Sequence, residues 1–335
     1  MHIGKAYRLS SFLYWTRRDL YLLVILASVP VVMYEVCGWK WAVLPWTVVS
    51  LLGTATAFIV GFKNTQTYNR TRDAQAVWTS IATTSNLWGI MCRDYFRDPA
   101  IARNLIYRHF AWLTALRYQL RGERVWEVAD MQHNAEYQRY YTIHERTCDL
   151  DGELAKYISV DERAKLTAVR SKTTQLLAMQ SAAVKAAYGA EAVLPAQFIE
   201  LQRTLNTFFA QQAQSESIKD TPYPRQYSII NTIFVRVFCV LLPFGLLQGF
   251  DELNRSTPGL MHGFMVWLLV PFCVIITWMY TSLVQVGEST ENPFEGSAND
   301  VPITQICRAI EIDLREMLGE KELPPVILPE NDIIL

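Results

Sequence analysis

The sequence is poor in charged residues and lacks the motifs that carry most enzyme chemistry. Only 19% of its 335 residues are charged, against about 25% in an ordinary soluble domain. It contains no glycine-rich phosphate loop, no H-E-x-x-H and no G-x-S-x-G. None of the six cysteines forms a C-x-x-C pair, and the five histidines show no metal-ligand spacing. We therefore expect that the protein is not an enzyme and that it requires no cofactor.

The sequence also lacks a large net charge and a recognisable targeting signal. The formal net charge is −1, so no basic surface argues for a nucleic-acid partner. Arg17 and Arg18 precede an apolar run that has no small-residue cleavage site after it, so we expect no signal peptide. One acidic cluster stands near a presumed loop, and a solvated face is favoured over a cation site there; its members are Glu145, Asp149, Asp151 and Glu153.

Apolar residues make up 51% of the chain, and they are gathered into four runs. The runs cover residues 20–36, 42–62, 227–250 and 260–286. A membrane-spanning helix needs about 20 apolar residues, so the first run is borderline and the second, which contains no charge, is long enough. Short polar linkers join the runs in pairs. The pattern predicts two transmembrane hairpins with four spans in all.

Between the hairpins, charges return with a helical periodicity. Asp98 before Pro99 predicts a helix start and Gly122 its end, and Ser159 with Glu162 forms a capping box for a helix that we expect to reach Gly189. No strand pattern is evident. The predicted organisation is all-α, and its parts are residues 1–62 (N-terminal segment and first hairpin), 63–224 (helical region, with a further helix from Pro195), 225–286 (second hairpin) and 287–335 (a C-terminal segment with a helix at 303–318).

Basic residues predict the orientation of the spans. The positive-inside rule places both termini and the helical region in the cytoplasm. The residues on the cytoplasmic side are Arg8, Arg17, Arg18, Lys63, Arg70, Arg72 and Arg225, and those on the other side are Lys40 and Arg255.

The second run carries a recurring pattern. Thr54, Phe58 and Phe62 are four residues apart and share one helix face, among small residues that let helices approach closely. If several copies surrounded an axis, these positions would form stacked rings, and rings of Phe form hydrophobic constrictions that gate by dewetting. The alternative is plain packing of both phenyl rings against other spans.

Several strings together resemble the bestrophin family, in its bacterial branch. They are residues 34–46 (YEVCGWKWAVLPW), 61–64 (GFKN), 222–227 (PYPRQY), 241–246 (LLPFGL), 287–303 (GESTENPFEGSANDVPI) and 307–318 (CRAIEIDLREML). The resemblance covers almost the whole chain in order and is weakest over residues 122–159.

The resemblance implies a homopentameric ion channel in the bacterial inner membrane, in which each subunit meets four identical ones around a central pore. It places the pore neck on Thr54, Phe58 and Phe62. A second, cytosolic aperture falls near Gln197, although Phe198 and Ile199 match nearly as well. Animal members bind calcium after the fourth span. Here that segment offers Asn292, Glu295, Asn299 and Asp300. Two of these are amides, and calcium favours several acidic oxygen ligands, so we expect weak or absent calcium activation. The favoured alternative is that this segment is a hydrogen-bonded turn.

Selectivity is left open by the residues, since the family contains both anion and cation channels. Lys63 at the inner mouth favours anions by raising the local potential, so we expect a monovalent anion such as chloride. The alternatives are a sodium-selective channel of the same architecture, a non-conducting scaffold and a secondary transporter. A transporter would show inverted repeats, and the two hairpins show no convincing internal similarity.

Overall fold

The structure is a computed structural model that describes all residues except 6–8, 128–137 and 259–261. Arg8, used above for orientation, lies outside the described residues. Regular structure in the described part is helical, and the β-bridges there are isolated ones near the chain ends, His2 with Ile333 and Glu330 with Ile333. The prediction of an all-helical fold is confirmed.

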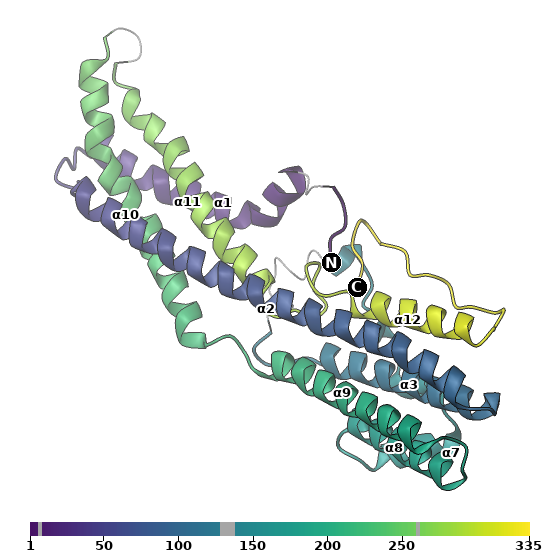
Figure 1. The fold of residues 1–335 in the computed structure, drawn as a ribbon. Coiled ribbons are helices and arrows are strands. Elements are labelled where there is room, and N and C mark those ends of the chain that lie inside the picture. Colours follow the sequence, from purple (N-terminus) through teal and green to yellow (C-terminus); the bar gives the residue numbers. More distant parts are fainter. Residues whose placement is uncertain (6–8, 128–137, 259–261) are drawn as a thin grey trace. The chain divides into compact units, whose positions relative to one another are not determined.

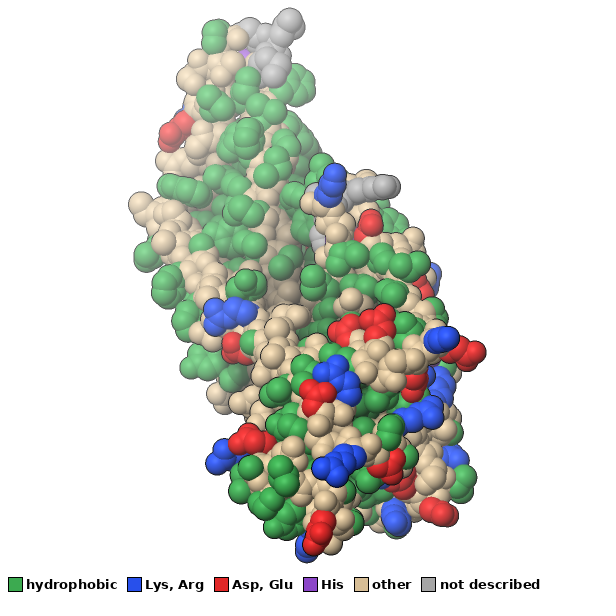
Figure 2. All heavy atoms as spheres, turned by 45° about the vertical axis from the view of Figure 1, so that its right-hand side comes forward, with side chains coloured by type: hydrophobic (Ala, Val, Ile, Leu, Met, Phe, Trp, Pro, Cys, Tyr) green, Lys and Arg blue, Asp and Glu red, His purple; other side chains and the backbone are tan. Residues whose placement is uncertain are grey.

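The chain forms two units (Figure 1). The apolar unit comprises Lys5–Asn69 and Tyr223–Glu291, and the polar unit comprises Met1–Gly4, Arg70–Pro222 and Asn292–Leu335. The long helix α2, Trp46–Tyr95, contributes residues to both. Figure 2 shows hydrophobic side chains covering the helices of the apolar unit, whereas acidic and basic side chains gather on the polar unit.

The apolar unit contains α1 (Leu9–Glu35), the first half of α2, α10 (Arg225–Ser256), the short η2 (Met265–Leu268) and α11 (Leu269–Ser289). α1 packs against both α10 and α11. Two glycines permit close helix contacts. A Cβ atom on Gly245 of α10 would lie 2.8 Å from Cγ2 of Val49, and one on Gly53 of α2 would lie 2.7 Å from Cε2 of Phe238.

Three helices are long and apolar enough to cross a membrane, namely α2, α10 and the segment Met265–Ser289. α1 is not among them. Its uncharged stretch lies between Asp19 and Glu35, so every 18-residue window of this helix includes three charged residues. The described residues therefore provide three clear candidate spans, and the fourth expected span rests on α1.

The polar unit is built around α3 (Pro99–Arg121), which packs against α6 (Leu150–Leu154), α8 (Lys172–Gly189), α9 (Pro195–Asp220) and α12 (Ile303–Met317). In Figure 1, α3, α9 and α12 run beside the second half of α2, and α8 packs against α3 and α9. The short η1 (Gln138–Tyr140) and α5 (His144–Thr147) precede α6. Large rings fill the core between these helices, including Trp78, Trp88, Trp112 and Phe208.

The local helix signals are mostly confirmed. Asp98 accepts a hydrogen bond from the backbone of Ala100, Gly122 caps the end of α3, and both hydrogen bonds of the Ser159–Glu162 capping box are formed. The expected single helix from Ser159 to Gly189 is wrong. It ends at Thr167 as α7 (Val160–Thr167), and Ser171 starts α8 by accepting a hydrogen bond from the backbone of Thr174. A second N-cap serine interrupts the helix because it satisfies the backbone locally.

Candidate functional site

Within the apolar unit, α2 has one buried and one exposed face. The buried face recurs every three or four residues, as a helix requires, and consists of Val49, Gly53, Thr56, Val60, Lys63 and Thr67. Tyr280 of α11 donates a hydrogen bond from its hydroxyl to the backbone oxygen of Gly53 at 3.1 Å. These contacts fix the rotation of α2 about its own axis within this unit.

Thr54, Phe58 and Phe62 lie on the exposed face. Phe58 is 76% exposed and Phe62 55% exposed, although both are large apolar rings. Thr54 is exposed as well, and its hydroxyl donates to the backbone oxygen of Ser50, which leaves no free donor on that side chain. The alternative that both phenyl rings pack against other spans of the same subunit is therefore not what the structure shows.

Lys63 lies on the buried face rather than with Phe62. Its side chain is 2% exposed, its Nζ lies 3.7 Å from Oε2 of Glu291, and it donates to the Ser228 hydroxyl at 3.1 Å. The positive charge is thus compensated within the subunit. The electrostatic argument for anions that rested on a free Lys63 at the inner mouth has no support in this geometry.

The residues considered for the cytosolic aperture lie at the start of α9 and differ in their surroundings. The Oε1 atom of Gln197 accepts a hydrogen bond from the backbone of Leu194 at 2.9 Å, so this side chain caps the helix. Phe198 stacks on Tyr188 with ring centroids 4.7 Å apart. Ile199 is 49% exposed and is the one of the three whose side chain is available to an opening.

The segment considered for calcium is a buried turn. The carboxylate of Asp300 accepts from the backbone of Gly296 at 2.7 Å and from the Ser297 hydroxyl at 2.5 Å, and it pairs with Arg121 at 3.2 Å. Asn292 donates to Glu295 at 3.3 Å, while Asn299 is half-buried. Both oxygens of the Asp300 carboxylate are engaged and its charge is compensated. This set does not fit a calcium ion, which requires several free acidic oxygens.

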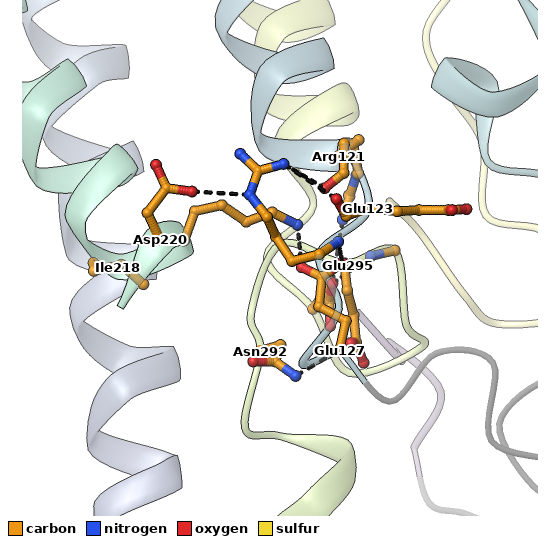
Figure 3. Close-up of polar contacts among 12 residues, drawn as sticks. Arg121, Glu123, Glu127, Ile218, Asp220, Asn292 and Glu295 are labelled. Atoms are coloured by element: carbon orange, nitrogen blue, oxygen red, sulfur yellow. Dashed lines mark hydrogen bonds and ion pairs between the residues drawn. The ribbon is translucent and has the colours of Figure 1, made fainter. Parts of the chain in front are cut away.

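Figure 3 shows the charged groups near this turn, which all belong to the polar unit. Arg124 pairs with Asp220 at 3.0 Å, and Lys219 pairs with Glu127. Burial lowers the pKa of Lys219, and the Glu127 carboxylate opposes that shift without cancelling it. The turn is therefore bordered by ion pairs formed inside the subunit.

The acidic cluster of residues 145–153 is solvated in part: Asp149 and Asp151 are exposed, as expected, but the expectation is wrong for Glu145 and Glu153. Glu145 pairs with Arg117 at 3.0 Å and with Arg121 at 3.9 Å, and the Thr304 hydroxyl donates to it. Burial raises the pKa of Glu145, but the two guanidinium groups more than offset this, so the pKa lies below its ordinary value of 4.5. Glu153 is buried too. The sequence gives no sign of this because the partners of Glu145 are far away along the chain.

Helices long enough to cross a bilayer, in a chain that also forms a charged helical unit, define the class: this is an all-helical membrane protein. The family model described as "Bacterial/Fungal Bestrophin protein" matches residues 18–316. The chain therefore belongs to the bacterial and fungal bestrophin family.

Curated relatives match over most of their length. The chain is 28% identical to the voltage-dependent anion channel-forming protein YneE of Escherichia coli K12, over 92% of this chain and 89% of that protein. It is 26% identical to the voltage-dependent anion channel-forming protein mll4386 of Mesorhizobium japonicum, over 83% of this chain and 76% of the relative.

Solved structures share the fold. A bacterial bestrophin homologue from Klebsiella pneumoniae superposes with a TM-score of 0.75 at 21% identity and covers 90% of this chain and 98% of its own. The all-helical architecture found here is thus the architecture of known bestrophin homologues.

Proposed function

We propose that the protein is a homopentameric channel in the bacterial inner membrane that conducts monovalent anions, chloride among them, through a neck lined by the exposed face of α2. The observation that carries the proposal is the pair of exposed phenyl rings, Phe58 and Phe62, opposite a fully packed face of the same helix. In a ring of symmetry-related subunits, the exposed faces of the α2 helices would face one another and be shielded from lipid, and a pore would remain along the symmetry axis. The names of the curated relatives support anions as the permeant ions.

A second observation supports an oligomer. Arg236 is exposed on α10, eleven residues after the start of that helix at Arg225, or about 16 Å along its axis. A charged side chain at the centre of a spanning helix costs about 2.5–3.5 kcal/mol or more against lipid. A neighbouring subunit or an aqueous path, rather than lipid, is the favoured surrounding for this face.

In the proposed channel, ions pass the rings of Phe58 and Phe62 partly dehydrated, and wetting of these rings controls conduction. Phenyl edges carry partial positive charge, so rings that turn their edges inward tolerate an anion. Ile199 forms the cytosolic aperture, and both termini and the polar unit are cytoplasmic. No calcium ion is required, since the turn at Asp300 offers no free acidic set.

The test is a planar-bilayer recording of purified protein under an asymmetric NaCl gradient. A reversal potential near the chloride equilibrium potential is expected; one near the sodium equilibrium potential would establish the sodium-selective alternative, and slow saturable flux without unitary currents would indicate a transporter. Phe58→Ala should raise conductance or open probability. Phe272→Ala removes an equally apolar exposed ring from α11 and should leave both unchanged. If the two variants behave alike, the neck assignment fails.

A further inference from the structure

Three metal-binding side chains meet in the polar unit. His144 belongs to α5, Cys148 follows α5 directly, and Glu153 belongs to α6. One ligand atom from each lies within 4.8 Å of the others. Cys148 caps the end of α5 with its backbone N–H on the His144 oxygen, which keeps the two side chains close, and the separate helix α6 brings Glu153 against His144. We propose that these residues form a site for a borderline divalent cation of the zinc type.

With either ring nitrogen of His144 as the ligand atom, one of the other two ligand atoms already lies at the distance that such an ion requires. The Sγ atom of Cys148 lies 3.7 Å from Nδ1 of His144, and Oε1 of Glu153 lies 3.5 Å from Nε2 of the same ring. Bonds of about 2.0–2.3 Å in tetrahedral geometry separate the ligand atoms by about 3.4–3.8 Å. A metal ion bound to one ring nitrogen of His144 would therefore require the more distant of the other two ligand atoms to move about 1 Å toward it. Rotation of that side chain provides such a movement.

The donor set selects the class of metal. Thiolate and imidazole ligands favour zinc and its neighbours over calcium or magnesium, which prefer oxygen. Three protein ligands leave a fourth position for water. Binding converts the Cys148 thiol to a thiolate and releases its proton to solvent, and the thiolate and the Glu153 carboxylate together balance the two positive charges of the ion.

The site is accessible. The His144 side chain is 41% exposed, and His144 also lines a cavity of about 290 Å³ in the polar unit, beside Arg117 and Arg308. Cys148 is half-buried, and Glu153 is buried with its carboxylate paired to Lys156. A metal ion from solvent can therefore reach the three side chains without unfolding the unit.

Lys156 provides a distinctive control. Its Nζ lies 2.6 Å from Oε1 of Glu153 and would compete with a metal for that oxygen, but its own side chain is 54% exposed and can turn into solvent. Lys156→Gln should therefore strengthen metal binding if Glu153 is a ligand. A purely structural role of the cluster predicts no such gain.

The experiment uses the full chain, free of affinity tags, purified in detergent and titrated with ZnCl2 in a calorimeter. One ion per chain is expected. Cys148→Ser should weaken binding by about tenfold to 100-fold or more, Lys156→Gln should strengthen it, and Cys37→Ser, which changes an exposed cysteine of the apolar unit, should have no effect.

A second readout keeps the test decisive if Cys148→Ser fails to fold. Cobalt added to the unmutated protein should give a thiolate-to-metal charge-transfer band in the near ultraviolet, and zinc should abolish it. Absence of zinc binding to the unmutated protein, absence of the cobalt band, or equal zinc affinity in a folded Cys148→Ser protein would each overturn the proposal.

Discussion

Arg121→Met would remove the central cation of a buried ion network. The Arg121 side chain is 1% exposed and lies between Asp300 at 3.2 Å and Glu145 at 3.9 Å. Methionine has a similar length and retains the packing of the alkyl part, so the variant mainly deletes the charge. The two carboxylates stay buried and lose one of their compensating partners.

The loss of stability depends on the partners that the Glu145 and Asp300 carboxylates retain in the variant. Deleting one partner of a buried ion pair costs about 3–5 kcal/mol. Glu145 retains Arg117 at 3.0 Å, and Asp300 retains the Gly296 amide and the Ser297 hydroxyl, so the lower end of that range, about 3 kcal/mol, is expected. For a unit of about 200 residues, each 1 kcal/mol lowers the unfolding temperature by about 2–4 °C, which gives about 6–12 °C.

The effect should depend on pH with a definite sign. The pKa of Glu145 is lowered in the folded protein from its ordinary value of 4.5, so this carboxylate stabilises the fold above that unfolded value and loses the contribution as the pH falls through the folded value. Without Arg121, burial raises the pKa of Glu145. Lowering the pH then protonates this carboxylate and removes its uncompensated buried charge. The difference in unfolding temperature between the unmutated protein and Arg121→Met should therefore be smaller at pH 4.5 than at pH 7.5.

Thermal unfolding followed by tryptophan fluorescence at both pH values measures this gap. Arg103→Met is the matched control, because Arg103 lies on the same helix, is 61% exposed and pairs with Glu320 at 3.4 Å; exposed pairs contribute about 1 kcal/mol at most. The reasoning is refuted if Arg121→Met and Arg103→Met unfold within about 2 °C of each other at pH 7.5, or if the gap widens in acid.

Three further outcomes are expected from the same unfolding assay. Gly89→Leu should destabilise the polar unit by about 1–3 kcal/mol, because a Cβ there would overlap Cδ2 of Leu314; an unchanged unfolding midpoint would contradict this contact. Ser159→Ala should cost about 1 kcal/mol by removing the capping box, and Ser159→Thr should restore most of it. Burial lowers the pKa of His109 to about 3, so the unfolded chain binds the proton first and stability should fall as the pH drops from about 6.5 toward 3; His109→Phe should flatten that slope, and an equal slope would show that another group titrates.

Local signals in the sequence predicted the helices well where the physics is local. Asp98, Ser159 and Pro195 start helices as expected, because a cap or a proline acts on backbone groups within a few residues. The helix periodicity that grouped Thr54, Phe58 and Phe62 also agrees with their shared exposure. Which face of α2 is buried depends on α10 and α11, and the sequence alone does not contain that partner choice.

Buried polar groups were the main source of error. Lys63 resembles an exposed residue at the end of a span, yet Glu291 lies 228 positions further along the chain and compensates it within the fold. The same applies to Glu145 with Arg117. Pairings of this kind are set by tertiary structure, and spacing along the chain does not reveal them.

The division of each unit among separate chain segments bears on the order in which the protein forms during synthesis. The apolar unit has all its residues once the chain reaches Glu291, but the polar unit still lacks its final segment at that point. α12 then brings Ile303, Cys307, Ile310 and Leu314 into the core beside α3. Until those residues leave the ribosome, apolar surface of α3 stays open, and domains caught in such incomplete states are prone to aggregate. A truncation before residue 303 should accordingly leave a chain that inserts its apolar helices but does not complete the polar unit.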